Sequence, residues 1–197
     1  MDNGGYGGGR REYGDRGRGG GRSSGGRNDR RPAPPRSTTA ASVEPEAAKP
    51  ARALLEELLG KMGIDDVAIV YIARSEGEYF EIRGPRLANL IGRNGNTLEA
   101  LNLIFNNILN AGVRNNRRYY TIDAEGYRAR RADLLKGLAL QTLERAIREK
   151  RSISLEPMLP SERKVIHLAL ADNPYVSTES TGVEPERRVV VIPKSGA

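Results

Sequence analysis

Apolar residues are sparse through residues 1–50 and then recur with a regular spacing. From about Ala51 they fall at intervals of one and three positions, which places them on one side of an α-helix. Gly60 and Gly63 mark the end of this pattern. The spacing predicts a first helix whose apolar stripe contains Leu54, Leu55, Leu58, Leu59 and Met62.

Two extended segments follow this helix. Residues 67–72 are rich in β-branched side chains and almost wholly apolar, whereas residues 79–83 alternate with a period of two. The polar residues 75–78 between them are typical of a turn. We therefore expect a β-hairpin.

The next stretch predicts two helices joined by a glycine-bounded loop. Residues 86–91 form the short first helix, and residues 92–95 read Gly-Arg-Asn-Gly. The second helix begins near Asn96 and ends at residues 110–112, where Asn-Ala-Gly is a reasonable stop. Residues 117–122 then predict a strand. Helical spacing within the second helix is kept by Leu98, Leu101, Ile104, Phe105 and Ile108.

A third long helix runs to about Lys150, and its buried face is well defined. A short strand at residues 153–155 precedes a helix that begins with Pro160, a residue suited to a first helical turn. Residues 175–180 and 187–192 predict two further strands. The expected core faces are Leu135, Leu138, Ala139, Thr142, Leu143, Ala146 and Ile147 in the long helix, and Val165, Ile166, Ala169 and Leu170 in the shorter one.

These elements predict an α+β fold in two small domains. Residues 51–125 have the order α-β-β-α-α-β, and residues 126–197 have the order α-β-α-β-β. Residues 1–50 are expected to be a disordered Gly/Arg-rich tail, because their composition cannot supply a core. Their last part, residues 32–50, is rich in Pro, Ala, Ser and Glu and is interpreted as a spacer.

The tail has two interpretations that the sequence leaves open. Its arginines alternate with glycines, and Tyr6 and Tyr13 lie among them, so guanidinium groups and aromatic rings are both available to stack on exposed bases. The alternative is a solubilising tail.

The overall charge favours a polyanionic partner. The net charge is +7 and the isoelectric point is near 9.9. The absence of Cys excludes disulfides and thiolate metal sites. The sequence contains neither a run of about twenty apolar residues nor an apolar leader, so we expect a cytoplasmic protein without an integral membrane segment.

The Gly-x-x-Gly loop is the first candidate site. Gly92 and Gly95 allow a sharp turn and a close approach to a ligand. The loop opens a helix, so unpaired N–H groups and the positive end of the helix dipole favour an anion, and Arg93 adds a cation beside Asn94. The pattern predicts a clamp for a nucleic-acid backbone. By itself it also fits an ordinary connection between helices.

The second candidate site lies on the helix that begins with Pro160. Arg163 and His167 are four positions apart and share one face, and Lys164 adds a cation. His167 is the single histidine, and its alternatives are a partly buried imidazole or an exposed one without a role. We favour a phosphate or base contact. Neither a metal site nor catalysis is expected, because no second His, no Cys and no nucleophile accompanies it.

Three arginines crowd the start of the third long helix, where the helix dipole disfavours cations. A nearby polyanion would relieve this repulsion, and solvation is the alternative. Both interpretations stay open for Arg128, Arg130 and Arg131.

The order of elements around the loop carries a family resemblance. Residues 51–124 resemble a KH domain of the type II arrangement, and Ile91 matches the apolar residue that usually precedes the loop. The resemblance implies that single-stranded RNA or DNA binds there, with the backbone of about four nucleotides held by the loop and the bases in an apolar groove.

Residues 126–194 resemble the small single-stranded nucleic-acid-binding domain named for its Arg-x-x-x-His motif. In that family the Arg and the His lie on an exposed basic face, which the resemblance carries over to Arg163 and His167. Lys164, Arg187 and Arg188 are added as nearby positive charge, as is Lys194.

Together the two domains resemble the bacterial Jag family, also called KhpB or SpoIIIJ-associated protein. The resemblance implies a cytoplasmic RNA-binding regulator or RNA chaperone linked to cell shape, envelope and division control. It also implies a small KH-only partner, and a homodimer is the alternative. Many members begin with a folded Jag domain, whereas this sequence begins with the Gly/Arg-rich tail, so roles of that domain, insertase-linked ones first, are not carried over.

Two other functions remain as alternatives to RNA binding: a single-stranded DNA-binding module and a protein-interaction scaffold. No cofactor, small-molecule substrate or enzymatic activity is expected, since no phosphate-binding Walker loop, metal cluster or nucleophile–base pair is visible.

Overall fold

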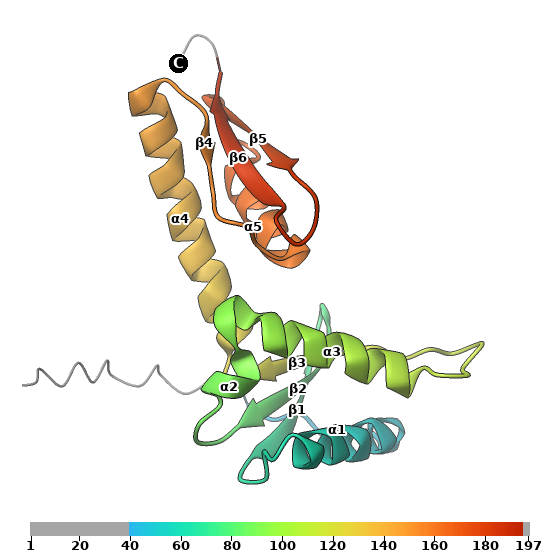
Figure 1. The fold of residues 1–197 in the computed structure, drawn as a ribbon. Helices are drawn as coiled ribbons and strands as arrows, with labels where there is room; N and C mark the ends of the chain where they lie inside the picture. Colours follow the sequence, from blue (N-terminus) through green and yellow to red (C-terminus); the bar gives the residue numbers. More distant parts are fainter. Residues whose placement is uncertain (1–39, 195–197) are drawn as a thin grey trace, which may run out of the picture. The chain divides into compact units, whose positions relative to one another are not determined.

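The computed structural model describes residues 40–194 (Figure 1). The predicted Gly/Arg-rich tail up to residue 39 lies outside the described residues. The predicted α+β class is confirmed, and the helices and strands follow the predicted order.

The elements fall into two groups along the chain. The first group is η1 (Glu46–Ala48), α1 (Lys49–Lys61), β1 (Ala68–Arg74), β2 (Gly77–Arg83), α2 (Ala88–Ile91), η2 (Arg93–Gly95), α3 (Asn96–Leu109) and β3 (Tyr120–Ala124). The second is α4 (Tyr127–Glu149), β4 (Ile153–Ser154), α5 (Pro160–Leu170), β5 (Val176–Thr181) and β6 (Arg188–Pro193).

The first group forms a three-stranded sheet in the order β1-β2-β3. β1 and β2 are the predicted antiparallel hairpin, with Arg74 opposite Gly77 across a tight turn. β3 pairs with β2 in parallel, so the segment between them is a crossover that contains α2, the loop and α3. The Gly-x-x-Gly loop therefore lies between two helices that are both tied to this sheet.

One apolar cluster joins this sheet to its helices. Phe80 and Ile122 from neighbouring strands pack with Leu55 of α1 and Phe105 of α3, and all four side chains are fully buried. The rings of Phe80 and Phe105 meet edge to face, with centroids 6.3 Å apart. This packing fixes α3, and with it the loop that begins it.

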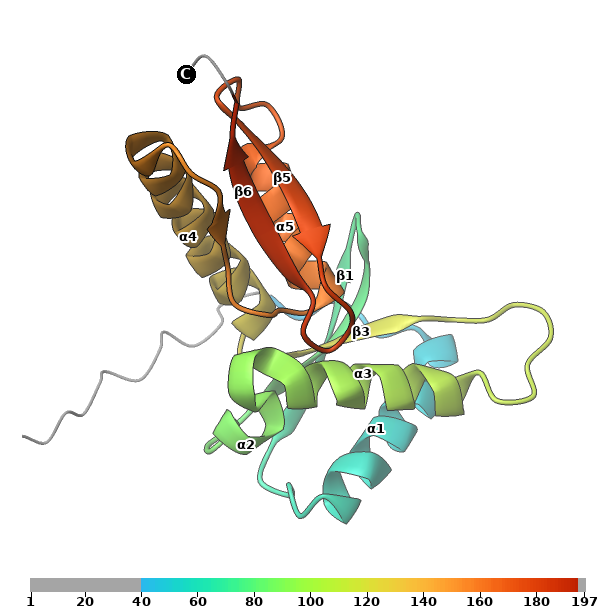
Figure 2. The same ribbon diagram turned by 45° about the horizontal axis from the view of Figure 1, so that its top comes forward.

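The second group builds its own sheet and its own core. The sheet is antiparallel in the order β4-β6-β5, and Figure 2 shows α5 behind β5 and β6. Buried Leu135 and Ala139 of α4 pack with Ile166 of α5 and Val189 of β6. Most of the predicted core face of α4 is confirmed, although Leu138 is 38% exposed.

Structure begins earlier than predicted. α1 starts at Lys49 rather than near Ala51, and residues 42–48 contact the first sheet instead of acting as a spacer. Ser42 N–H donates to the Tyr71 carbonyl at 2.9 Å, and Glu44 pairs with Arg52. The same composition suits a linker and a helix start, because Pro50 fits the first helical turn and Ala48 is small enough to be fully buried.

Three asparagines on α3 bond to the free edge of β3. Asn106 accepts the Tyr120 N–H at 3.0 Å and donates to the Tyr120 carbonyl at 2.8 Å. Asn102 accepts the N–H of Ile122. Asn110 treats the backbone of residue 118 as Asn106 treats that of Tyr120. Spaced four residues apart, these amides take the place of a neighbouring strand.

This asparagine ladder explains two differences from the predictions. The third strand starts at Tyr120 rather than at residue 117, because the backbone of Arg118 is bonded to Asn110. Ile104 and Ile108 are exposed rather than buried, since the inner face of α3 is turned toward the asparagines. An apolar pattern alone cannot detect such a rotation.

Among the helices of residues 40–194, none combines the length and the apolar composition that crossing a membrane requires.

Candidate nucleic-acid interface

The backbone of the Gly-x-x-Gly loop depends on both glycines. Gly92 has φ 72° and Gly95 has φ 79°, which are left-handed conformations. A Cβ at Gly92 would lie 2.8 Å from Thr97 Cβ, and one at Gly95 would lie 2.6 Å from Tyr127 Cε1. Both positions thus exclude a side chain on steric and conformational grounds.

The two central residues of the loop point into solvent. Arg93 and Asn94 are exposed, while Ile91 and Gly92 are half-buried and Gly95 is buried. Within residues 40–194 the Arg93 side chain forms no hydrogen bond or ion pair. The fourteen-residue helix α3 begins directly after Gly95. A cation next to a helix N-terminus is an arrangement that attracts phosphate.

Contacts from the start of α4 support the loop from behind. The ring of Tyr127 covers Gly95, and Arg128 donates through Nε to the Ile122 carbonyl at 2.9 Å. Arg128 also pairs with Glu99 at 2.9 Å. The loop is therefore held on a rigid base, although Arg93 and Asn94 themselves are free to meet a ligand.

The three arginines at the start of α4 make internal contacts. Besides Arg128, Arg130 donates to the Glu125 carbonyl and Arg131 donates to Glu162 with 2.6 Å between Nε and Oε1. They are held by the protein, which differs from both of the open interpretations, a nearby polyanion and simple solvation. Spacing along the sequence could not identify partners as distant as Glu162.

Arg163 and His167 lie together on α5, but they do not form the exposed basic face that the resemblance implied. Arg163 is only 6% exposed, and its Nη2 donates to the carboxylate of Glu184. Its Nε is buried without a hydrogen-bond partner. Glu184 belongs to the loop between β5 and β6, and its own side chain is 51% exposed.

His167 bonds to two hydroxyl groups of β5. Its Nδ1 lies 2.7 Å from Thr178 Oγ1 and its Nε2 lies 2.8 Å from Ser180 Oγ. Burial, followed by the nearby charge of Arg163, lowers the pKa of His167 below its usual value of 6.5. The imidazole is therefore neutral near pH 7, in contrast to the partial protonation expected from an unperturbed group.

The remaining predicted cations differ in their surroundings. Lys164 and Arg187 are exposed, whereas Arg188 is half-buried and pairs with Glu186 at 3.4 Å. The sequence analysis missed Thr178, Ser180 and Glu184. The first two could have been noticed, because polar residues at every second position of a strand share one face.

The outer edge of β3 is not available to a ligand in this structure. Backbone groups of residues 118, 120 and 122 are bonded to the asparagine ladder of Asn102, Asn106 and Asn110. A base that was to pair with this edge would have to displace an asparagine. Among residues 40–194 no group of three or more His, Cys, Asp or Glu side chains is placed to hold a metal ion.

Comparison with known proteins gives two findings. Residues 133–193 match the family of the Arg-x-x-x-His domain. The chain is also similar to proteins named RNA-binding protein KhpB: 36% identical over 138 residues to that of Clostridium symbiosum, 38% over 114 residues to that of Bacillus subtilis, and 39% over 103 residues to that of Streptococcus pneumoniae D39.

The similarity covers part of each protein. It spans 70% of this chain and 62% of the Clostridium protein, 57% and 54% for the Bacillus pair, and 52% and 31% for the Streptococcus pair. The chain thus matches less than two thirds of the length of these relatives.

Proposed function

We propose that this chain binds single-stranded RNA and holds its sugar–phosphate backbone at residues 92–95. The observation that carries the proposal is the loop itself. Two left-handed glycines without room for a Cβ bring the backbone close to the surface, and exposed Arg93 and Asn94 stand at the N-terminus of α3. The relatives named RNA-binding protein KhpB and the match to the Arg-x-x-x-His domain family support nucleic acid as the ligand.

The topology around the loop supports the assignment of residues 51–125 to a KH domain. β2, α2, α3 and β3 form a β-α-α-β unit whose two strands are parallel neighbours, and α1 and β1 precede it. In KH domains the loop between the two helices clamps about four nucleotides. Residues 91–95 occupy that position here.

In the second domain we propose that a phosphate exchanges with Glu184. The Arg163 guanidinium is buried, so it must keep an anionic partner, and the Glu184 carboxylate fills that role in the free chain. Because Glu184 is half-exposed on a loop, a phosphate oxygen can replace its carboxylate without unfolding the domain. His167, Thr178 and Ser180 would then supply neighbouring polar groups.

Removing this competitor tests the exchange. Glu184→Ala is expected to raise the affinity for single-stranded RNA about two- to fivefold, the range that 0.2–1 kcal/mol for a half-exposed ion pair allows. Fluorescence anisotropy with a labelled oligonucleotide measures it. Glu179→Ala removes the same charge from an exposed position of β5 and is the matched control. An equal gain in both variants, or none in Glu184→Ala, would refute the exchange.

Binding to RNA rather than DNA needs a direct comparison. We expect RNA to displace a matched DNA oligonucleotide from the full chain in competition, with an affinity that falls as salt rises, by a slope of about −0.7 per phosphate contacted. Preference for DNA would favour the single-stranded DNA-binding alternative. Absence of binding to either would contradict the function.

The two sites lie on one chain, so modest contacts at each can add through effective concentration. From the resemblance to KhpB we further propose a cytoplasmic regulator or RNA chaperone linked to cell envelope and division, working with a small KH-only protein or a second copy. Immunoprecipitation of the chain from its own cells, with sequencing of bound RNA and identification of co-purified proteins, tests this role.

A further inference from the structure

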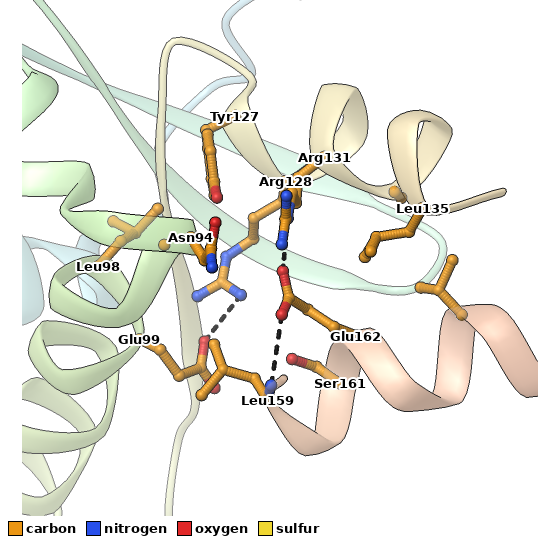
Figure 3. Close-up of a pocket in the computed structure, with 13 residues that line it drawn as sticks. Asn94, Leu98, Glu99, Tyr127, Arg128, Arg131, Leu135, Leu159, Ser161 and Glu162 are labelled. Atoms are coloured by element: carbon orange, nitrogen blue, oxygen red, sulfur yellow. Dashed lines mark hydrogen bonds and ion pairs between the residues drawn. The ribbon is translucent and has the colours of Figure 1, made fainter. Parts of the chain in front are cut away.

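A pocket of about 170 Å³ lies next to the proposed clamp (Figure 3). Asn94 and Gly95 of the loop form one side of it, the first turns of α4 form another, and the start of α5 closes it. The pocket is smaller than the roughly 300–1,000 Å³ that is typical of cofactor and drug sites. Its size suits one flat ring system rather than a whole nucleotide cofactor.

The walls of this pocket favour a neutral ligand. Leu98, Leu135, Leu159 and Val165 supply apolar surface. The charged groups in the pocket are already paired, since Arg128 binds Glu99 and Arg131 binds Glu162 (Figure 3). A phosphate would have to compete with two carboxylates there, whereas an uncharged ring would not.

One polar group in the pocket has no partner. Arg128 Nη2 is buried and forms no hydrogen bond, although Nε and Nη1 of the same guanidinium are both satisfied. Buried donors are rarely left unpaired, because the lost hydration costs about 1–3 kcal/mol. A carbonyl oxygen or ring nitrogen of a nucleobase would supply the missing acceptor.

We propose that this pocket receives one nucleobase of the RNA strand whose backbone lies on residues 92–95. The inference rests on the proposed function and extends it from the backbone to a base. Asn94 and Gly95 belong to both clamp and pocket, so the base would be attached to a nucleotide held by the loop. The pocket offers a base what the edge of β3 does not, because the asparagine ladder occupies that edge.

The test combines a filled pocket with missing bases. Ala132→Phe places a ring in the pocket from α4, and Ala129→Phe makes the same change at an exposed position of that helix. Ser161→Tyr narrows the pocket from α5 and serves if Ala132→Phe unfolds. Each full-length variant is titrated with a four-nucleotide RNA and with four versions that each carry one abasic position.

We expect one abasic position to weaken wild-type binding about tenfold, within the range known for a stacked base. Ala132→Phe should bind the intact RNA about tenfold more weakly and should lose nothing further at that position, while Ala129→Phe should behave like the wild type. Equal losses at all four positions, or unchanged binding by both pocket variants, would overturn the base pocket and leave the clamp intact. Failure of the wild type to bind the intact RNA would overturn the proposed function itself.

Discussion

The double substitution Arg93→Asp/Asn94→Asp is expected to lower the affinity for single-stranded RNA about 100-fold and to leave the fold intact. It replaces a cation and a neutral amide at the clamp by two carboxylates, which repel the phosphates that the loop is proposed to hold. Loss of one or two charge-assisted hydrogen bonds, at about 1.5–3 kcal/mol each, accounts for an effect of this size. Titration at fixed salt, with circular dichroism as the check on folding, measures it.

The structure indicates that the variant will fold. Both side chains are exposed, and Asn94 has a left-handed backbone that Asp adopts nearly as readily as Asn. Arg114→Asp/Asn115→Asp is the matched control, because it makes the same change of charge at exposed positions between α3 and β3. If the control lost as much affinity as the clamp variant, binding would follow net charge and the clamp would be refuted.

Asn106→Ala is expected to lower the free energy of unfolding by about 2–4 kcal/mol. The substitution leaves both the N–H and the carbonyl of buried Tyr120 without a partner. Each buried group that loses its hydrogen bond costs about 1–3 kcal/mol. Urea denaturation followed by circular dichroism gives the difference.

The neighbouring asparagine provides the control. Asn107 lies on the same helix but is exposed, so Asn107→Ala should change the free energy of unfolding by no more than about 0.5 kcal/mol. Comparable losses for the two variants would mean that helix propensity, and not the bonds to Tyr120, determines the effect. The asparagine ladder would then have no stabilising role.

Local patterns predicted the features that depend on neighbouring residues. The spacing of Gly92 and Gly95 indicated a turn that needs left-handed backbone, and the structure has it. Period-two alternation identified the hairpin, and the helical spacing of Leu98, Leu101 and Phe105 identified the inner face of α3. These signals are contained within a few residues, so one sequence is enough to read them.

Features that depend on distant partners could not be predicted in this way. The spacing of Arg163 and His167 correctly placed them on one face of α5, but spacing does not tell whether that face is covered. Glu184 lies 21 residues beyond Arg163 and covers it through a loop. The ladder from Asn102 to Asn110 likewise depends on where β3 lies, which the helix sequence does not contain.

The central claim is that RNA backbone contacts residues 92–95. An amide NMR titration of the full chain with a four-nucleotide single-stranded RNA tests this claim most directly, because each backbone N–H reports separately. The account predicts that the largest shifts fall on the amides of Gly92, Arg93, Asn94 and Gly95 and on the first turn of α3. Large shifts elsewhere with these amides unmoved would contradict it.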